Sequence, residues 1–432
     1  MKILATADLH LGRATATGND QNEMLSATQV WQRIVTYAIE QNVDLLLLAG
    51  DIIDRDNRFY EAAGPLQQGF KKLGSANIPV YAIAGNHDFD TLPNLLESNT
   101  TGLEHVHLLG KGGKWELQNI KIGNKQVQIM GWSFPGQYVN QNPLLGASLP
   151  DIDDNVPAIG LLHGELNNPE SRYAPLASAE LQQVQGVNSW IVGHIHKPDL
   201  SEENSLILQP GSPQPLSRKE TGLHGPWLLE FDGAFLKNAT QVGLSEVRFD
   251  TLSINVDQIE SAPDFRSKLL NEVERFTGHL VSEQPALHTI QLNIELTGHH
   301  KNPGIFDEWA GFADDYTTEL DRSLDISIAR VSNRIRPAVA NMEELAGQKS
   351  PVGILARMLL CLEQGEHLPA GGRHLIENIQ KEISRMNGNK VYLPLRNFGG
   401  QLPPDEESAR GLLANECRKL IGELVFNQKE ES

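Results

Sequence analysis

The sequence predicts a layered α/β domain, with helices covering a sheet or a pair of sheets, followed by a small α+β module and a helical C-terminal region. The first observation behind this prediction is a series of short, continuously apolar runs that alternate with helical patterns in the first half of the chain. The second is a change of pattern near residue 250, and the third is helical periodicity in nearly everything after residue 338. With 432 residues, the chain is long enough for two or three domains.

The first region, which we place at residues 1–245, alternates strand and helix patterns. Ile3–Ala7 is an apolar strand, and the positions between Val30 and Ala38 have the spacing of an amphipathic helix. Asp44–Ala49 is a continuous apolar run of the kind found in strands that are buried on both faces. Further strands are predicted at Ile78–Ala84, Val127–Gly131, Ala158–His163, Trp190–Gly193, Leu206–Gln209 and Trp227–Phe231.

The second region, at residues 250–335, has the pattern of a compact α+β module. Its predicted elements are a strand at Leu252–Val256, a helix at Phe265–Phe276, a strand at Thr289–Leu296, a helix at Gly304–Phe312 and a strand at Ser323–Val331.

The third region, at residues 338–432, is predicted to be helical, with helices at Val352–Leu362, Leu375–Met386 and Glu406–Val425 separated by breaks that contain Pro and Gly. The last of these helices carries an apolar stripe made of Leu412, Leu413, Cys417, Leu420, Ile421 and Leu424. Such a stripe either packs on the preceding helices or docks in a groove of another protein.

Composition limits the classes of protein to which the chain can belong. The net charge is −19, which argues against strong DNA binding by this chain alone, because non-specific affinity for DNA comes from basic side chains. No apolar run reaches the length of a membrane span, and the first ten residues resemble a strand more than a signal peptide. The only cysteines, Cys361 and Cys417, are expected to be buried, reduced thiols, so we expect a cytoplasmic protein without membrane contact.

Side chains that bind metals follow five of the predicted strands. In chain order they are Asp8 and His10, Asp51, Asn86 and His87, His163, and finally His194 and His196. Because residues just past the C-terminal ends of neighbouring strands converge on one crevice, we expect these side chains to meet. Gly50, Gly85 and Gly193 would permit the sharp turns that aim the ligands inward.

These side chains supply enough oxygen and imidazole ligands for two metal ions, with Asp51 as the natural bridge between them. A set of Asp, Asn and His ligands without Cys favours Mn²⁺, Fe²⁺, Mg²⁺ or Zn²⁺. Two ions about 3.5–4 Å apart are a common device for splitting phosphate esters. The sequence therefore predicts a dinuclear phosphoesterase.

The five motifs resemble those of the calcineurin-like metallophosphoesterase superfamily over about residues 1–240. A narrower resemblance is to the SbcD-type DNA repair exonuclease subunits, including their YhaO-like branch. It rests on residues 8–12, on Gly50–Asp54, on Gln209–Pro213, and on the small module and helices that follow.

The resemblance implies a role for each site residue. One ion would be held by Asp8, His10, Asp51 and His196, and the other by Asp51, Asn86, His163 and His194, with Mn²⁺ as the first candidate metal. A metal-bridging hydroxide would attack the phosphodiester. His87 would contact the phosphate and stabilise or protonate the departing oxygen, with Asp88 as its orienting partner. Asp54 is expected to support a neighbouring group or to cap a helix.

The resemblance also implies a DNA exo/endonuclease of an SbcCD-like repair complex, bound through its C-terminal helices to an SMC-like, SbcC-type ATPase, with the small module capping the active site. Arg13, Arg55 and Arg58 are candidate substrate-binding residues, although ordinary loop charges would look the same. One alternative is a small-molecule or nucleotide phosphodiesterase or phosphatase, which the acidic composition suits. Another is a scaffold subunit. The sequence leaves open whether the chain forms a homodimer.

Overall fold

The structure is a computed structural model that describes residues 1–13, 26–54, 59–98, 101–201, 205–311, 324–337, 342–369, 371–388 and 405–430. The chain forms two compact units. The first consists of Met1–Thr251, Glu274–Leu292 and Leu320–Ser327, and the second consists of Leu252–Val273, Asn293–Glu319 and Ile328–Ser432. The finer division into domains at 1–245, 250–335 and 338–432 stays a prediction.

The first unit contains a six-stranded sheet with the strand order β12-β11-β1-β2-β3-β4. Its strands are β1 (Lys2–Thr6), β2 (Leu45–Ala49), β3 (Val80–Ile83), β4 (Val106–Leu108), β11 (Trp227–Asp232) and β12 (Phe235–Gln241). Strands β1 to β4 are parallel, and β11 pairs antiparallel to β1. The carboxyl ends of the first three strands therefore lie along one edge of the sheet.

A second six-stranded sheet has the order β5-β6-β7-β8-β10-β9. Its strands are β5 (Glu116–Ile122), β6 (Lys125–Gly131), β7 (Ala158–His163), β8 (Ser189–Gly193), β9 (Asp199–Ser201) and β10 (Leu206–Gln209). Strands β6, β7, β8 and β10 are parallel, whereas β5 and β9 pair antiparallel at the two edges. The sequence did not predict β5, because its half-exposed residues lack a continuous apolar run.

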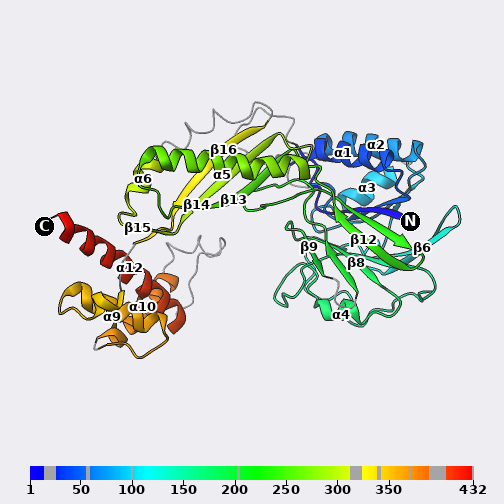
Figure 1. The fold of residues 1–432 in the computed structure, drawn as a ribbon. Helices are drawn as coiled ribbons and strands as arrows, with labels where there is room; N and C mark the ends of the chain where they lie inside the picture. Colours follow the sequence, from blue (N-terminus) through cyan, green and yellow to red (C-terminus); the bar gives the residue numbers. More distant parts are fainter. Residues whose placement is uncertain are drawn as a thin grey trace. The chain divides into compact units, whose positions relative to one another are not determined.

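The two sheets pack face to face. Successive residues of a strand point to opposite faces, so Ile3 and Leu45 join Ile159 and Ile191 in the cluster between the sheets. On the outer face of the first sheet, Leu46 packs in a cluster with residues of α1 (Ala27–Glu40), α2 (Phe59–Ser75) and α3 (Thr91–Ser98). A third cluster, with α4 (Ser178–Gln182), covers the outer face of the second sheet. Figure 1 shows these layers, which confirm the predicted α/β sandwich.

The elements after residue 246 match the predicted module closely. They are β13 (Val247–Asn255), α5 (Ala262–Glu283), β14 (Thr289–Thr297), β15 (His299–His300), α6 (Ile305–Ala310), β16 (Asp325–Asn333) and β17 (Arg336–Pro337). Strands β13, β14 and β16 form a three-stranded sheet. Helix α5 is longer than predicted, and its Phe265 ring lies 5.5 Å from the Phe306 ring of α6, measured between ring centroids.

The C-terminal helices are α8 (Met342–Ala346), α9 (Pro351–Glu363), α10 (Gly372–Gly388) and α12 (Glu406–Glu430). Packing among these helices buries one part of the apolar stripe of α12 and leaves the other part exposed. Leu413, Cys417 and Ile421 are buried in a cluster with residues of α9 and α10. Leu412 and Leu420 remain exposed, at 39% and 36%. Part of the stripe therefore stabilises the helical core, and docking of these helices on another protein stays a prediction.

Two further predictions concern membranes and cysteines. No helix in the described part of the chain is both long and apolar enough to cross a membrane. Cys361 and Cys417 are free thiols; Cys417 is buried, as expected, but Cys361 is only partly buried.

Candidate metal centre

The predicted ligands lie on loops at the carboxyl ends of five strands. Asp8 follows β1, Asp51 follows β2, Asn86 follows β3, His163 ends β7 and His194 follows β8. The loops after β1 and β2 run side by side, since the backbone N–H of Asp8 donates to the Gly50 carbonyl oxygen at 3.1 Å. Because β1, β2 and β3 belong to the first sheet and β7 and β8 to the second, the ligands at these strand ends come from both sheets.

Four residues of the site adopt backbone conformations that are rare for residues other than glycine. The φ angles are 52° at Asp8, 45° at His10, 50° at Asp51 and 104° at His194. Such conformations cost on the order of 1–3 kcal/mol each and persist only where the surrounding structure enforces them. Their concentration here indicates that the fold holds these loops in position for the site.

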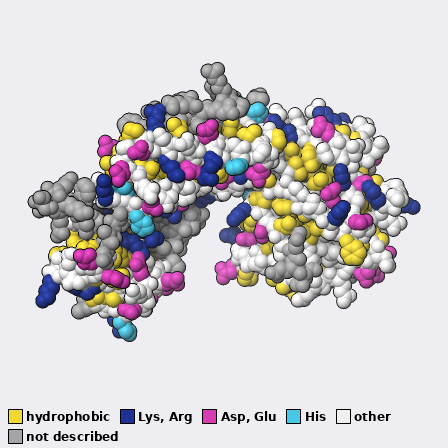
Figure 2. Space-filling view, in the orientation of Figure 1, with side chains coloured by type: hydrophobic (Ala, Val, Ile, Leu, Met, Phe, Trp, Pro, Cys, Tyr) yellow, Lys and Arg dark blue, Asp and Glu magenta, His cyan; other side chains and the backbone are white. Residues whose placement is uncertain are grey.

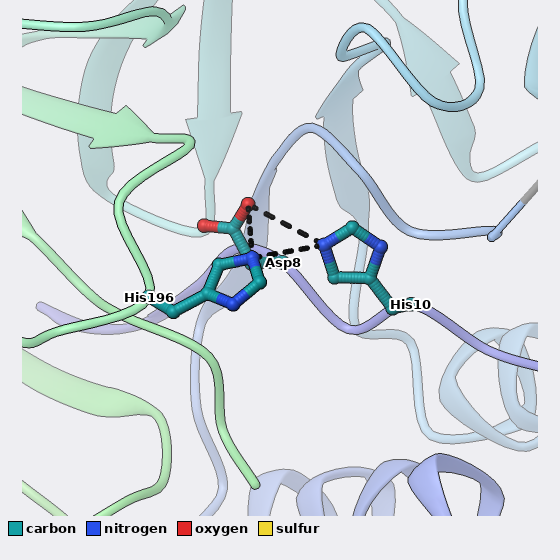
Figure 3. Close-up of side chains that lie close together, drawn as sticks. All are labelled: Asp8, His10 and His196. Atoms are coloured by element: carbon teal, nitrogen blue, oxygen red, sulfur yellow. Dashed lines mark hydrogen bonds and ion pairs between the residues drawn. The ribbon is translucent and has the colours of Figure 1, made fainter. Parts of the chain in front are cut away.

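One group of ligand atoms comes from Asp8, His10 and His196. Figure 3 shows the Asp8 carboxylate and the two imidazoles pointing toward one another. The Nε2 atoms of His10 and His196 are 3.1 Å apart. Asp8 Oδ1 lies 3.9 Å from His10 Nε2 and 4.0 Å from His196 Nε2. Three ligand atoms thus face a common point.

A second group comes from Asn86, His163 and His194. Asn86 Oδ1 lies 3.1 Å from His163 Nε2 and 3.2 Å from His194 Nδ1. His163 and Asn86 are buried, and the side chain of His194 is 16% exposed. The two groups use all four histidines that the sequence singled out as ligands.

Asp51 lies between the two groups and contributes to both with the same oxygen. Asp51 Oδ2 is 3.8 Å from His10 Nε2 and 3.3 Å from His163 Nε2. The other oxygen, Oδ1, accepts a hydrogen bond of 2.8 Å from the backbone N–H of His87. This hydrogen bond orients the carboxylate, so that Oδ2 is the atom that could bridge two cations.

The ring nitrogens that point away from the centre have different partners. His163 Nδ1 donates to the Ala49 carbonyl oxygen at 2.9 Å, so Nε2 is the ring nitrogen that faces Asp51. His196 Nδ1 lies 3.3 Å from Glu220 Oε1. His10 Nδ1 is buried without a hydrogen-bond partner in the described part of the structure. A hydrogen-bond partner at the outer ring nitrogen, such as the Ala49 carbonyl oxygen or Glu220, fixes the tautomer of a metal-binding histidine.

The surroundings raise the pKa of His163 and lower the pKa values of His10 and His194. Burial disfavours a charged imidazole at His163, but the Asp51 and Asp8 carboxylates outweigh burial and raise the pKa of His163 to about 9. Burial lowers the pKa of His10 to about 3, and burial together with the charge of His163 lowers the pKa of His194 to about 4. The buried carboxylates of Asp8 and Asp51 therefore keep His163 positively charged. A metal cation bound at this place could balance the charge of the two carboxylates in place of the protonated imidazole.

The donor set suits divalent cations. Ligand atoms that share an ion at about 2.0–2.2 Å lie roughly 3–3.6 Å from one another. The separations of 3.1 and 3.2 Å in the second group fall in this range, and those in the first group run from 3.1 to 4.0 Å. Three sets of side chains have ligand atoms within 4.8 Å of one another: Asp8, His10 and His196; His10, Asp51 and His87; and Asp8, Asp51 and His163. The mixture of carboxylate, amide and imidazole fits the harder divalent metals.

His87 and Asp88 occupy different positions at the edge of this centre. The His87 ring lies at a near right angle to the His10 ring, with centroids 4.8 Å apart. His87 Nδ1 is 3.4 Å from Asp54 Oδ1, so the carboxylate beside His87 is that of Asp54. Asp54 also lies 4.0 Å from Arg13 Nε, and Arg13 is 38% exposed. These contacts give Asp54 and Arg13 a place next to the site.

Asp88 is buried and holds two loops together. Its carboxylate accepts hydrogen bonds from the backbone N–H groups of Gly85 and Ile52 at 2.7 Å and of Ile53 at 3.2 Å. Burial and the charge of Asp51 raise the pKa of Asp88 to about 7 against the effect of these donors. Asp88 thus ties the Asn86 loop to the Asp51 loop, whereas we expected it to orient the His87 side chain.

Arg55 and Arg58 fall outside the described residues. Sequence reasoning missed Glu220, which contacts His196 from a loop 24 residues further along the chain. The motif at Gln209–Pro213 is the one signal that pointed to this neighbourhood.

Comparisons with known proteins agree with this geometry. Residues 1–198 match the family model described as calcineurin-like phosphoesterase. The metallophosphoesterase YhaO of Bacillus subtilis is 32% identical over 204 residues, which are 46% of this chain and 48% of that protein. The DNA double-strand break repair proteins Mre11 of Methanopyrus kandleri and Sulfolobus acidocaldarius are 24% and 26% identical over 54% and 69% of this chain, and over 54% and 75% of their own lengths.

The chain spans about half the length of the first two of these relatives, YhaO and the Methanopyrus protein. The matched residues 1–198 contain every predicted metal ligand, from Asp8 to His196. The N-terminal part of this chain is therefore similar in sequence to the calcineurin-like phosphoesterases, and the similarity includes the whole candidate metal centre.

Proposed function

We propose that this chain is a dinuclear phosphodiesterase that cleaves DNA, as the exo/endonuclease subunit of an SbcCD-like repair complex. The proposal of two metal ions rests on the position of Asp51 Oδ2, which is 3.8 Å from His10 Nε2 and 3.3 Å from His163 Nε2. One oxygen shared by two ligand groups would place two ions side by side, and paired ions about 3.5–4 Å apart split phosphate esters.

The protein's own residues would divide the work. Asp8, His10, Asp51 and His196 would hold one ion, and Asp51, Asn86, His163 and His194 would hold the other. When bound, the ions would activate water near neutral pH and neutralise charge on the phosphate. Mn²⁺ is our first candidate, with Mg²⁺, Fe²⁺ and Zn²⁺ as alternatives. His87, which lies beside Asp54, would donate a proton to the leaving oxygen.

The proposal of DNA as substrate draws on two observations. Two of the relatives described above are named as DNA double-strand break repair proteins. Arg13 lies at the edge of the centre with its side chain 38% exposed, where it could contact a phosphate. The net charge of −19 means that much of the DNA affinity would come from a partner, and Figure 2 shows acidic and basic side chains intermixed over the visible face.

The partner that we propose is an SMC-like ATPase of the SbcC type, bound through the C-terminal helices. Leu412 and Leu420 of α12 are exposed and lie eight residues apart, so they share one face of the helix. Such a partner could supply the basic surface that this acidic chain lacks.

A small-molecule or nucleotide phosphodiesterase is the second candidate function. The acidic composition favours it, because a small substrate does not require an extended basic surface. A mononucleotide or a chromogenic phosphodiester would then be hydrolysed while DNA remains intact.

One assay separates these functions. Purified protein, with and without Mn²⁺, is incubated with linear double-stranded DNA, single-stranded DNA, bis(p-nitrophenyl) phosphate and a mononucleotide. We expect Mn²⁺-dependent cleavage of DNA and of the chromogenic diester, and none by Asp51→Asn, whose amide cannot replace the bridging carboxylate. Hydrolysis of the small substrates alone would establish the second function, and activity without any metal would refute the dinuclear mechanism.

A further inference from the structure

A polar loop lies behind one of the metal-facing histidines and is organised around Glu220. The Glu220 side chain is 14% exposed, and its carboxylate has four partners. Oε1 lies 3.3 Å from His196 Nδ1 and accepts a hydrogen bond of 3.0 Å from Ser217 Oγ. Oε2 accepts hydrogen bonds from Ser212 Oγ at 3.0 Å and from the Leu216 backbone N–H at 2.8 Å. With these contacts the carboxylate is held in one orientation.

The same loop also holds the backbone of His196. The N–H of Ser212 donates to the His196 carbonyl oxygen at 3.0 Å. Gly211 has a φ of +72°, and a Cβ atom at this position would lie 2.6 Å from the His196 carbonyl oxygen. The buried His224 donates from Nδ1 to the Ser212 carbonyl oxygen at 2.7 Å. The loop therefore fixes His196 at both its main chain and its ring.

The other three imidazoles of the centre have no comparable support. His163 donates to a neutral carbonyl oxygen, that of Ala49. In the described part of the chain, His10 Nδ1 has no hydrogen-bond partner. At the His194 ring, the Glu165 carboxylate lies 4.0 Å from Nε2, which is beyond hydrogen-bonding distance. Among the described residues, His196 is thus the one histidine of the four whose outer nitrogen lies within hydrogen-bonding distance of a carboxylate.

We infer that Glu220 is a positioning residue that sets the metal affinity of the site formed by Asp8, His10 and His196, while leaving the site of Asn86, His163 and His194 unaffected. An ionised carboxylate at Nδ1 fixes the tautomer that presents the Nε2 lone pair, and it makes that nitrogen a stronger donor to a cation. This inference rests on the proposed dinuclear function. It adds that the metal affinity of one ion site is set independently of the metal affinity of the other.

The test is calorimetric titration of the metal-free full-length protein with Mn²⁺, comparing the wild type with Glu220→Gln. Gln keeps the size of the side chain and removes its charge. We expect one of the two binding events to weaken by roughly 10- to 100-fold, which is the usual effect of losing an outer partner of a ligand, while the other keeps its affinity. Equal affinities in both proteins would overturn the inference.

Glu180→Gln is the matched control. Glu180 also organises a loop, since its carboxylate accepts hydrogen bonds from the Ala177 N–H at 2.7 Å and from Asn142 Nδ2 at 2.8 Å, but neither partner is a ligand. This variant should bind both ions as the wild type does. If Glu220→Gln weakens both sites equally, the loop is a general structural element and the inference is wrong.

A spectroscopic measurement on the wild type makes the test independent of how well the variant folds. Protein labelled with ¹⁵N-histidine, with His196 assigned by substitution, should show a proton on Nδ1 and a bare Nε2 in the metal-free state near pH 8. The opposite tautomer would refute the role of Glu220. If Glu220→Gln weakens only one of the two binding events and the wild type cleaves no phosphodiester, this inference is supported and the proposed function is refuted.

Discussion

The histidines of the metal centre differ in protonation although they lie within a few ångströms of one another. In the metal-free protein His163 has a pKa of about 9, because the Asp51 and Asp8 carboxylates outweigh burial, whereas His10 and His194 have pKa values of about 3 and 4. At neutral pH one proton therefore occupies the nitrogen that would bind a cation. Metal binding and proton release are coupled at this residue.

We predict that Mn²⁺ binding near pH 7.5 releases about one proton, most of it from His163. Because His163 is protonated below a pKa of about 9, a rise in pH removes the competing proton and strengthens binding. The apparent affinity should rise about tenfold per pH unit until that pKa is reached. Calorimetry in buffers with different ionisation enthalpies measures the released protons. A binding enthalpy that is the same in every buffer would contradict the prediction.

His87 should behave differently from the ligands. We predict that His87→Ala retains both ions and loses roughly 10²–10⁴-fold in kcat, the usual effect of removing a general acid or base. His194→Ala should lose metal as well as activity, since its Nδ1 faces Asn86 Oδ1 at 3.2 Å. Elemental analysis of the purified variants distinguishes the two cases. Equal loss of metal from both would show that His87 is a ligand.

At the scale of single elements, the ends of strands determine where the ligands lie. A Cβ atom on Gly193, the last residue of β8, would overlap the Ala49 carbonyl oxygen and crowd His163 Nδ1. The Ala49 carbonyl oxygen also accepts the hydrogen bond that orients His163. Even one methyl group at the end of this strand would therefore disturb a ligand on another strand.

We predict that Gly193→Ala lowers the free energy of unfolding by about 1–3 kcal/mol, the usual cost of overpacking, and weakens Mn²⁺ binding. Gly278→Ala is the control. Gly278 lies on the exposed side of α5, and a Cβ atom there would have no neighbour within 4 Å. The control should gain roughly 0.5–1 kcal/mol, because Ala is the better helix former. Denaturant unfolding of both variants tests this, and a neutral Gly193→Ala would show that the strand end can shift.

The buried strands and the ligands that follow them could be predicted from sequence because both signals are local. Leu45–Ala49 is apolar without interruption, and Asp51 comes two residues later. Glu220 could not be predicted in this way. It lies among Ser217, Arg218 and Lys219, a sequence typical of a solvated loop, and only tertiary structure brings its carboxylate to His196. The same holds for the stripe of α12, because periodicity does not reveal which of its leucines a neighbouring helix covers.

At the scale of the whole molecule, the helical C-terminal region combines a core with an exposed face. We predict that the double variant Leu412→Glu and Leu420→Glu abolishes co-purification with a co-expressed SMC-like ATPase while the thermal midpoint stays unchanged, because both side chains are exposed. Cleavage of a small phosphodiester should also remain. A variant that still co-purifies with the ATPase would refute docking through this face.

Ile421→Ala provides the matched comparison on the same helix. Ile421 is fully buried in the cluster with α9 and α10, so its truncation should cost about 2–5 kcal/mol of stability. The expected result is a lower thermal midpoint of the C-terminal helices. If Ile421→Ala leaves stability unchanged, α12 does not belong to the helical core.

The metal centre joins parts of the chain that are far apart in synthesis. His10 and His196 meet although 186 positions separate them, and Glu220 follows 24 positions later. A ribosome that adds about 5–20 residues per second needs on the order of 10–40 s between the first of these histidines and the last. During that interval the early ligands emerge without their partners, and a nascent chain cannot yet form either complete set. Neither set of candidate ligands can therefore be complete before most of the N-terminal half has been translated and folded.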